Sequence, residues 1–173
     1  MKKLDKLNLV YGLIQPPPAI EARSQRFTLP ITVLSLVNVI IVSSIDPSSL
    51  PLVRSLHLSS TQTCKPIRLL LPNIASLHVR YMSMIADIDK SIQQSTSITS
   101  LSIYENAIAR LDDASKTVIR ERIVEFKVTA WPFYAYVNVA LAAILDGSKA
   151  MKMAILDGVY LNVADQMGPK FLS

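Results

Sequence analysis

The chain contains few cysteine, glycine and aromatic residues, and each shortage excludes a class of protein. Cys64 is the only cysteine among 173 residues, which excludes an internal disulfide and a cysteine-based zinc cluster. The four glycines are too scattered to form a glycine-rich phosphate loop. Aromatic residues make up 6 % of the chain and are not interleaved with Lys and Arg, as they are in nucleic-acid stacking platforms. The Asn-x-Ser/Thr glycosylation signal is also missing, and these absences together favour an intracellular protein.

Acidic residues are missing from residues 47–86, so positive charge dominates the first half of the chain. Residues 1–86 contain nine Lys or Arg against three acids, whereas residues 87–173 contain nine against ten. Such a half is expected to attract phospholipid headgroups or nucleic acid. The alternative is that a few solvated basic side chains happen to fall there. The residues predicted to contact an anionic partner are Lys2, Lys3, Lys6, Arg23, Arg26, Arg54, Lys65 and Arg68.

One long uncharged run, residues 27–45, admits two interpretations. About 20 residues suffice for a helix to cross the roughly 30 Å hydrocarbon core of a membrane. However, many residues of the run are β-branched and suit a sheet better than a helix. Asn38, near its middle, would also need a hydrogen-bonding partner in lipid. We therefore expect a buried inner β segment, with a membrane span as the alternative.

Residues 1–26 are predicted to be a flexible arm ahead of a single domain, residues 27–173. The arm begins with three lysines, and its apolar residues 4, 7, 10 and 14 have a spacing near the helical period. The triplet Pro16-Pro17-Pro18 then favours extended polyproline geometry. A basic amphipathic arm of this kind can lie on an anionic membrane, although a flexible terminus with a rigid proline spacer fits as well.

The rest of the chain predicts an α+β domain with an antiparallel sheet and one or two packed helices. Ser102 and Glu105 have the spacing of a capping box, so a helix is expected from there to about residue 122. Alternating residues predict a strand over 124–130. Asp-Gly pairs at 146–147 and 157–158 are hairpin signals and favour an antiparallel meander over residues 123–165, with helices at 137–145 and 148–156 as the alternative. Shorter segments are expected as strands within 52–60 and 67–79 and as a helix within 82–92.

Few residues are candidates for chemistry. Asp87 and Asp89 form a hydrophobic-Asp-x-Asp pattern that resembles the metal-binding pair of sugar-nucleotide transferases, and neighbouring carboxylates suit a divalent metal. The pattern is very short, and two solvated helix acids are the simpler interpretation. His57, Cys64 and His78 have no acid near them in the sequence to orient a base, and Cys64 is expected to be a small buried residue. Catalytic residues, metals and cofactors are therefore not expected.

The apolar character of the chain indicates self-association. Mean hydropathy is +0.34, so apolar surface is expected to remain after folding and to be covered by a second copy, a membrane or another partner. The aromatic residues Trp131, Tyr134 and Tyr136 are the expected contacts of a homo-oligomer.

The N-terminal region combines a basic tip, a proline triplet and the entry Arg26-Phe27-Thr28 into the domain. Together with the overall size, this layout resembles that of rhabdovirus matrix proteins, the short ones of plant-infecting members above all. The resemblance implies a peripheral membrane protein of an RNA virus, located in the virion and the host cytoplasm, that self-associates and condenses the nucleocapsid beneath the envelope. The Pro-Pro-x-Tyr budding signal of the animal-virus relatives is missing, because Ala19 and Ile20 follow the prolines.

The sequence therefore predicts a non-enzymatic structural protein that self-associates and binds an anionic membrane, a nucleoprotein or nucleic acid. Two alternatives remain open. One is a single-span membrane protein anchored by residues 27–45, and the other is a small metal-dependent enzyme that uses Asp87 and Asp89.

Overall fold

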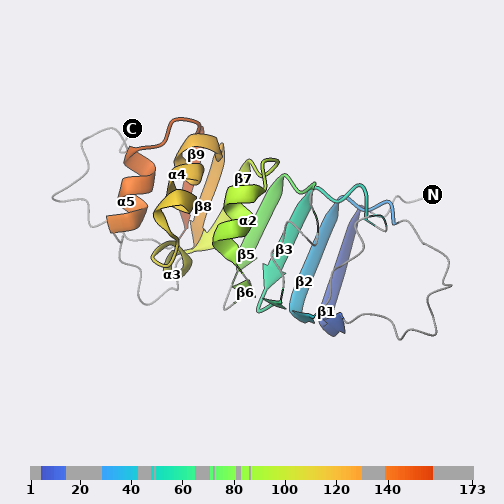
Figure 1. Ribbon diagram of the computed structural model, residues 1–173. Helices are drawn as coiled ribbons and strands as arrows, with labels where there is room; N and C mark the ends of the chain where they lie inside the picture. Colours follow the sequence, from blue (N-terminus) through green and yellow to red (C-terminus); the bar gives the residue numbers. More distant parts are fainter. Residues whose placement is uncertain are drawn as a thin grey trace.

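A parallel β-sheet runs along the whole length of the molecule (Figure 1). The computed structural model describes residues 5–14, 29–42, 48, 50–64, 71, 73–80, 83–85, 87–129 and 139–157. The main strands follow one another in space in the order of the sequence, and every pair is parallel. These strands are β1 (Lys6–Ile14), β2 (Val33–Ile41), β3 (Ser55–Ser59), β5 (Ser76–Arg80), β7 (Ser100–Tyr104), β8 (Glu125–Thr129) and β9 (Met153–Asp157).

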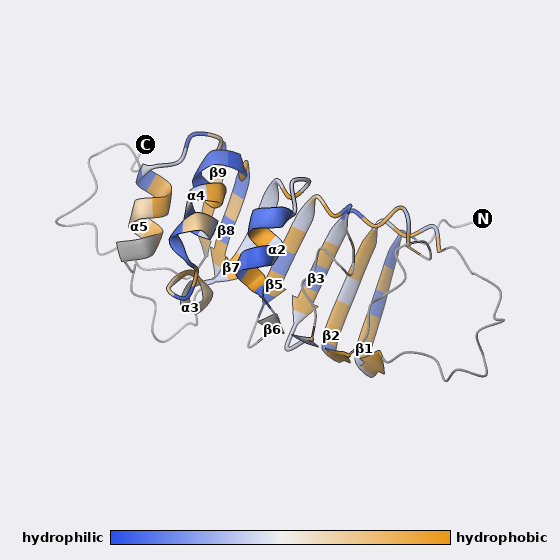
Figure 2. Ribbon diagram, viewed as in Figure 1, coloured by the Kyte–Doolittle hydropathy of each residue, from blue (hydrophilic) through white to orange (hydrophobic). Residues whose placement is uncertain are grey.

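Two rows of apolar side chains cross the strands and form the core. Alternate residues of a strand point to opposite faces, so each strand contributes two residues to the buried face. The strand register stacks these residues side by side, and all of those named next are at most 5 % exposed. The first row is Leu34, Leu56, Leu77, Leu101 and Phe126, and the second is Leu36, Leu58, Val79, Ile103 and Val128. Figure 2 shows the resulting alternation of hydrophobic and hydrophilic bands along the strands.

Helices connect the strands of the C-terminal half and pack on the core side of the sheet (Figure 1). Parallel neighbours require such crossover connections, because the chain must return to the same end of the sheet before each new strand. Helix α2 contacts α4, and α4 contacts α5. The helices are α2 (Ile88–Gln94), α3 (Glu105–Ile108), α4 (Asp113–Arg122) and α5 (Val139–Asp146).

Three neighbouring strands, β3, β5 and β7, have similar sequences. The segments 55–58, 76–79 and 100–103 read Ser-Leu-His-Leu, Ser-Leu-His-Val and Ser-Leu-Ser-Ile. In each, the second and fourth residues belong to the two core rows. The three segments therefore form a short internal repeat on adjacent parallel strands.

Three neighbouring strands bend at the same level. Tyr11, Asn38 and Ser60 have φ of 58°, 54° and 48°, and the register places them side by side. Beyond the bend, β2 pairs with β4 (Gln62–Thr63), and β4 pairs with β6 (Met84–Ile85). The bend therefore changes the direction of the sheet near the carboxyl ends of β1, β2 and β3.

The buried-strand interpretation of the long apolar run is confirmed. Residues 33–41 form β2, which lies between β1 and β3, so a helix over residues 27–45 is excluded. Among the described residues, no helix has both the length and the apolar character needed to cross a membrane. Residues 6–14, which the sequence assigned to a flexible arm, form β1 and pair with β2 along nearly their whole length.

The prediction of an α+β domain with an antiparallel sheet is wrong, because every strand pair is parallel and the fold is α/β. The meander over residues 123–165 is therefore also wrong. The strand over 124–130 exists as β8, but the chain then returns through α5 before β9 pairs with β8 in parallel. The alternative helix at 137–145 corresponds to α5, whereas the helix at 148–156 is replaced by β9.

The expected capping box is also wrong. Ser102 lies inside β7 and is buried, so it caps no helix. The residue that caps α4 is Asp112, whose side chain accepts a hydrogen bond of 2.7 Å from the Ser115 backbone N–H. The long helix expected over 102–122 is thus a strand, the single turn α3, and α4.

Candidate binding face of the sheet

The face of the sheet opposite the helices is polar at its centre. Strand residues that alternate with the core rows point to this face, and α2 and α4 lie on the other one (Figure 1). We call this surface, in the part of the chain that the structure describes, the open face. The polar and charged side chains at its strand positions are Lys6, Asn8, Ser35, Ser55, His57, Ser59, Ser76, His78, Arg80, Ser100, Ser102, Tyr104, Glu125, Lys127 and Thr129.

Two Ser–His pairs form the centre of the open face. The Ser55 hydroxyl lies 3.0 Å from His57 Nε2, and the Ser76 hydroxyl lies 2.8 Å from His78 Nε2. Each pair joins residues i and i+2 of one strand, which are on the same face. The register places His57 directly beside His78, and their ring centroids are 4.2 Å apart at an interplanar angle of 35°.

The two imidazoles lie in a positive environment. Burial, followed by the charges of His78, Lys6 and Arg80, lowers the pKa of His57 from 6.5 to about 4. Burial, followed by the charges of Arg80 and Lys127, lowers the pKa of His78. Both rings are therefore neutral at pH 7, while Lys6, Arg80 and Lys127 supply positive charge from three different strands.

Two polar atoms of this cluster have no hydrogen-bond partner. They are Nδ1 of His78 and Oγ of Ser102, and both are buried. Ser102 is 1 % exposed and lies between His78 and Lys127 in the register. A buried polar group without a partner costs about 1–3 kcal/mol, so a ligand that satisfied either atom would recover that free energy.

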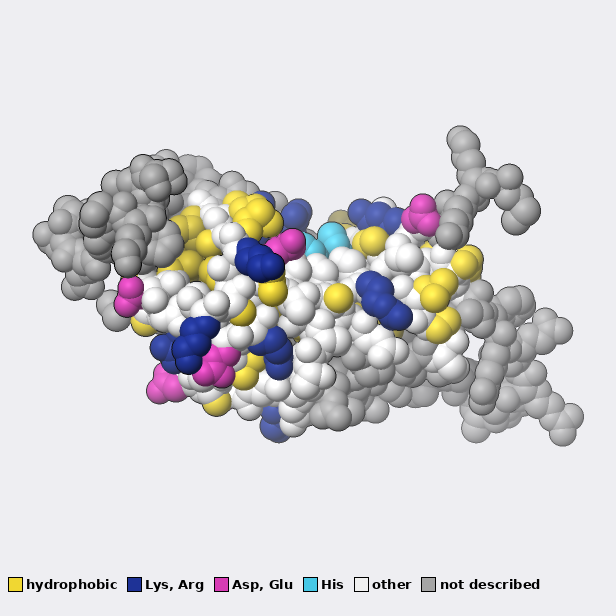
Figure 3. Space-filling model, turned by 90° about the horizontal axis from the view of Figure 1, so that it is seen from above, with side chains coloured by type: hydrophobic (Ala, Val, Ile, Leu, Met, Phe, Trp, Pro, Cys, Tyr) yellow, Lys and Arg dark blue, Asp and Glu magenta, His cyan; other side chains and the backbone are white. Residues whose placement is uncertain are grey.

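The centre of the open face has small side chains, with the charges around it. Ser55, Ser76 and Ser100 are adjacent in the register and form a row of hydroxyls. Figure 3 shows the two histidines at the upper margin, with Lys or Arg side chains and an Asp or Glu side chain on either side. This arrangement offers hydrogen-bond donors and positive charge to a ligand that carries negative charge.

The structure places only part of the predicted anionic-partner contacts. Lys6 belongs to the open face, whereas Arg54 lies just before β3 and donates hydrogen bonds of 3.2 Å to the carbonyls of Pro51 and Val53. The other predicted anionic-partner contacts lie outside the described residues: Lys2, Lys3, Arg23, Arg26, Lys65 and Arg68. The predicted self-association contacts, Trp131, Tyr134 and Tyr136, lie outside them as well.

Sequence reasoning missed Arg80 and Lys127 and dismissed the two histidines. The usable signal was the repeated Ser-Leu-His of residues 55–57 and 76–78. Equivalent positions in a repeat lie side by side, so this repetition alone places the two imidazoles together.

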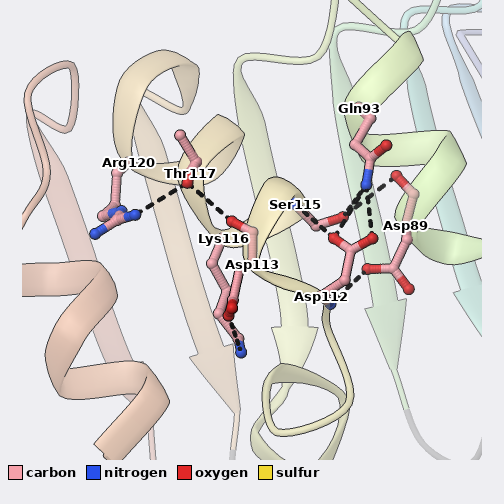
Figure 4. A network of polar contacts seen from close by, with 8 residues as sticks. All are labelled: Asp89, Gln93, Asp112, Asp113, Ser115, Lys116, Thr117 and Arg120. Carbon is pink, nitrogen blue, oxygen red and sulfur yellow. Dashed lines mark hydrogen bonds and ion pairs between the residues drawn. The ribbon is translucent and has the colours of Figure 1, made fainter.

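The two aspartates of the metal-enzyme alternative do not face a common site. Asp87 pairs with Lys90 at 3.1 Å, while Asp89 Oδ1 accepts a hydrogen bond of 3.0 Å from the backbone N–H of Asp112. Figure 4 shows Asp89 within a network between α2 and α4, in which Gln93 donates to both carboxylate oxygens of Asp112 at 3.0 and 2.9 Å. Asp89 therefore helps to hold two helices together.

No metal site is formed in the described parts of the chain, where His, Cys, Asp and Glu do not gather in groups of three or more. Cys64 is exposed at the end of β4, so the expectation that it is a small buried residue is wrong.

Comparison with known proteins gives no relative: no family model, curated protein or solved structure matches this chain. The function must therefore be inferred from the geometry and charge of the open face.

Proposed function

We propose that the protein is a non-enzymatic binding module whose open face holds an acidic, extended segment of a partner protein. The observation that carries the proposal is the charge distribution of this face. At the strand positions that belong to it, Lys6, Arg80 and Lys127 are basic and form a group over β1, β5 and β8, whereas the acidic residues Glu125 and Asp157 lie on β8 and the edge strand β9. The stacked Ser and His side chains between them provide hydrogen bonds to such a segment.

The Ser–His pairs support binding better than catalysis. A serine nucleophile needs a basic imidazole whose second nitrogen is held by a third group, usually a carboxylate. In the pair with the shorter contact, His78 Nδ1 has no partner, and burial, followed by the charges of Arg80 and Lys127, lowers the pKa of this imidazole. His57, with a pKa of about 4, is a weak base.

The shape and composition of the face favour an extended peptide over a membrane or nucleic acid. The open face crosses several neighbouring parallel strands, and an extended chain can contact these strands in turn. A membrane-binding surface combines Lys and Arg with inserted Trp, Phe or Leu, whereas Ser and His occupy the centre here. Nucleic acid would require aromatic side chains for base stacking and more positive charge than three basic residues supply.

The interpretation as a viral matrix protein stays a prediction. Both the matrix-protein interpretation and the binding-module proposal describe a non-enzymatic protein that recognises a negatively charged partner, and both include Lys6 as a predicted contact. Self-association through Trp131, Tyr134 and Tyr136 likewise stays a prediction, because these residues lie outside the described parts of the chain.

The proposal can be tested by peptide binding with matched charge variants. Fluorescence anisotropy would measure the affinity of a labelled Glu-rich peptide and of a Lys-rich peptide of equal length for the full chain. We expect the Glu-rich peptide alone to bind, and the double variant Arg80→Gln, Lys127→Gln to lose at least tenfold in affinity.

The matched control is the double variant Lys90→Gln, Lys149→Gln, which removes the same charge from the exposed helical side of the molecule. It should bind as the wild type does. Equal losses in both double variants would show a general charge effect and contradict the proposal. Binding to anionic vesicles without binding to the Glu-rich peptide would favour the membrane interpretation instead.

A further inference from the structure

The open face contains a buried pair of polar atoms that no other group satisfies. His78 Nδ1 and Ser102 Oγ belong to adjacent strands and to directly paired residues. Ser102 is 1 % exposed, so solvent does not hydrate its hydroxyl. In most proteins such atoms have a partner, so two of them on paired residues are a position where a ligand could supply the hydrogen bonds.

We propose that His78 and Ser102 form a subsite for a single oxyanion, a phosphoryl or carboxylate group, with Arg80 and Lys127 as its counter-charges. The proposal rests on the proposed function, because this oxyanion would be one acidic side chain of the bound segment. The subsite adds to that function the two atoms that would bind the oxyanion, His78 Nδ1 and Ser102 Oγ.

The hydrogen bond between Ser76 and His78 determines which nitrogen of the His78 imidazole carries the proton. When the Ser76 hydroxyl donates to His78 Nε2 across their 2.8 Å contact, the neutral ring has its proton on Nδ1. Nδ1–H and the Ser102 hydroxyl are then two donors from neighbouring strands that can converge on one oxygen-rich group. Ser76 therefore acts as a positioning residue for the imidazole.

The charges around the pair select an anion over a metal cation. Arg80 is two residues from His78 on the same strand, and Lys127 is paired with Ser102 in the register. Both basic residues therefore lie on the same face of the sheet as the pair, Arg80 on the strand of His78 and Lys127 on the strand next to Ser102. A cation at this position would be repelled by both, whereas an oxyanion would gain charge-assisted hydrogen bonds.

Entry of the ligand requires one side chain to move. Ser102 lies between two larger residues, and of these Lys127 has the long, flexible side chain. The proposed subsite requires Lys127 to rotate about its side-chain bonds, which leaves the backbone in place, so that the oxyanion can reach the Ser102 hydroxyl. The ammonium group can then pair with the oxyanion that has entered.

The test is a titration of the full chain, labelled with ¹⁵N in its histidines, with inorganic phosphate. We expect saturable shifts of the His78 ring nitrogens, larger than those of His57, and a higher pKa of His78 when phosphate is bound, since a bound anion favours the protonated ring. Ser102→Ala should weaken phosphate binding about tenfold, the loss expected for one hydrogen bond to a charged group.

The control is Ser148→Ala, which removes a hydroxyl at the end of α5, outside the open face. It should bind phosphate as the wild type does, and near-native circular dichroism of both variants shows that each is folded. Unchanged affinity in Ser102→Ala, shifts centred on His57, or no saturable binding would each overturn the subsite.

Two peptides show whether the oxyanion is a phosphoryl or a carboxylate group. They also distinguish failure of the subsite from failure of the proposed function. A peptide with a single phosphoserine and its counterpart with glutamate show whether a phosphoryl or a carboxylate group binds more tightly. If Glu-rich peptides bind but Ser102→Ala has no effect, the subsite is wrong and the proposed function stands. If phosphate binds at Ser102 but neither peptide binds, the subsite stands and the proposed function is wrong.

Discussion

Replacing Leu58 and Leu9 separately by Ala tests the stacked core directly, because the two residues occupy the same row at different depths. The register pairs Leu9 with Leu36 and Leu36 with Leu58. Leu58 is 1 % exposed in the interior of the stack, whereas Leu9 is 39 % exposed on the edge strand β1. The chemical change is the same in both variants, so any difference in stability comes from position in the stack.

The expected losses follow from burial. At Leu58 the lost transfer free energy combines with the cavity left among its neighbours, giving about 3–4 kcal/mol, within the range for buried leucines. At Leu9 part of the side chain is already in water and no closed cavity forms, so the loss should be roughly 1–1.5 kcal/mol. The difference between the variants is therefore about 2 kcal/mol.

Urea denaturation followed by circular dichroism measures this difference. With an m-value of about 1–3 kcal/mol per molar urea, the midpoint of Leu58→Ala should lie roughly 1–2 M below that of Leu9→Ala. Similar midpoints, or a lower midpoint for Leu9→Ala, would refute the parallel register, since another pairing of the strands would bury these residues differently. Leu7→Ala, in the other row of β1, is a further control expected to resemble Leu9→Ala, because it too lies on the edge strand.

Three further predictions concern single side chains. Asp112→Ala should lower the free energy of unfolding by about 1 kcal/mol because α4 loses its N-cap, whereas Asp113→Ala, which removes only an exposed ion pair, should change it by less than about 0.5 kcal/mol in urea titrations. Asn38→Val should cost about 1–2 kcal/mol by the same measurement because φ is 54° there, while Asn38→Gly should stay close to the wild type; similar losses would contradict the left-handed backbone. Stability should fall as the pH is lowered from about 6.5 to 4, because burial of the ring and then the charges of His78, Lys6 and Arg80 lower the pKa of His57, so the unfolded chain binds a proton there before the folded chain does. After allowance for partial exposure this contribution is about 1–2 kcal/mol, and it should be missing from the pH dependence of His57→Gln; identical pH profiles would show that the ring is not held neutral.

Individual segments were easier to predict from the sequence than their pairing. The β-branched residues of 33–41 and the alternation over 124–130 identified β2 and β8 correctly, because these patterns reflect burial of one or both faces of a strand. The direction of pairing could not be found in the same way, because alternation looks the same in parallel and antiparallel sheets. The Asp-Gly pair at 146–147 was misleading: the backbone N–H of Gly147 bonds to the Ala143 carbonyl at 3.2 Å and ends α5.

The capping-box pattern failed because core packing outweighs a local signal. Leu101 and Ile103, on either side of Ser102, fill both core rows, and together they bury more apolar surface than a helix cap can offset. The sequence did not predict Arg80 and Lys127 as site residues for a related reason. Arg80 and Lys127 are far apart in the sequence, and only the register of β5, β7 and β8 brings them to the same cluster.

The pairing of each strand only with its neighbours has a consequence for how such a chain can change over time. A duplicated strand with its return segment would add one layer whose two sides match the layers already there. Gain or loss of whole layers alters the length of the molecule while the interior of every remaining layer is preserved. Related chains of different length could therefore arise by duplication without redesign of their interiors, and each added layer would widen the surface offered to a partner by one strand.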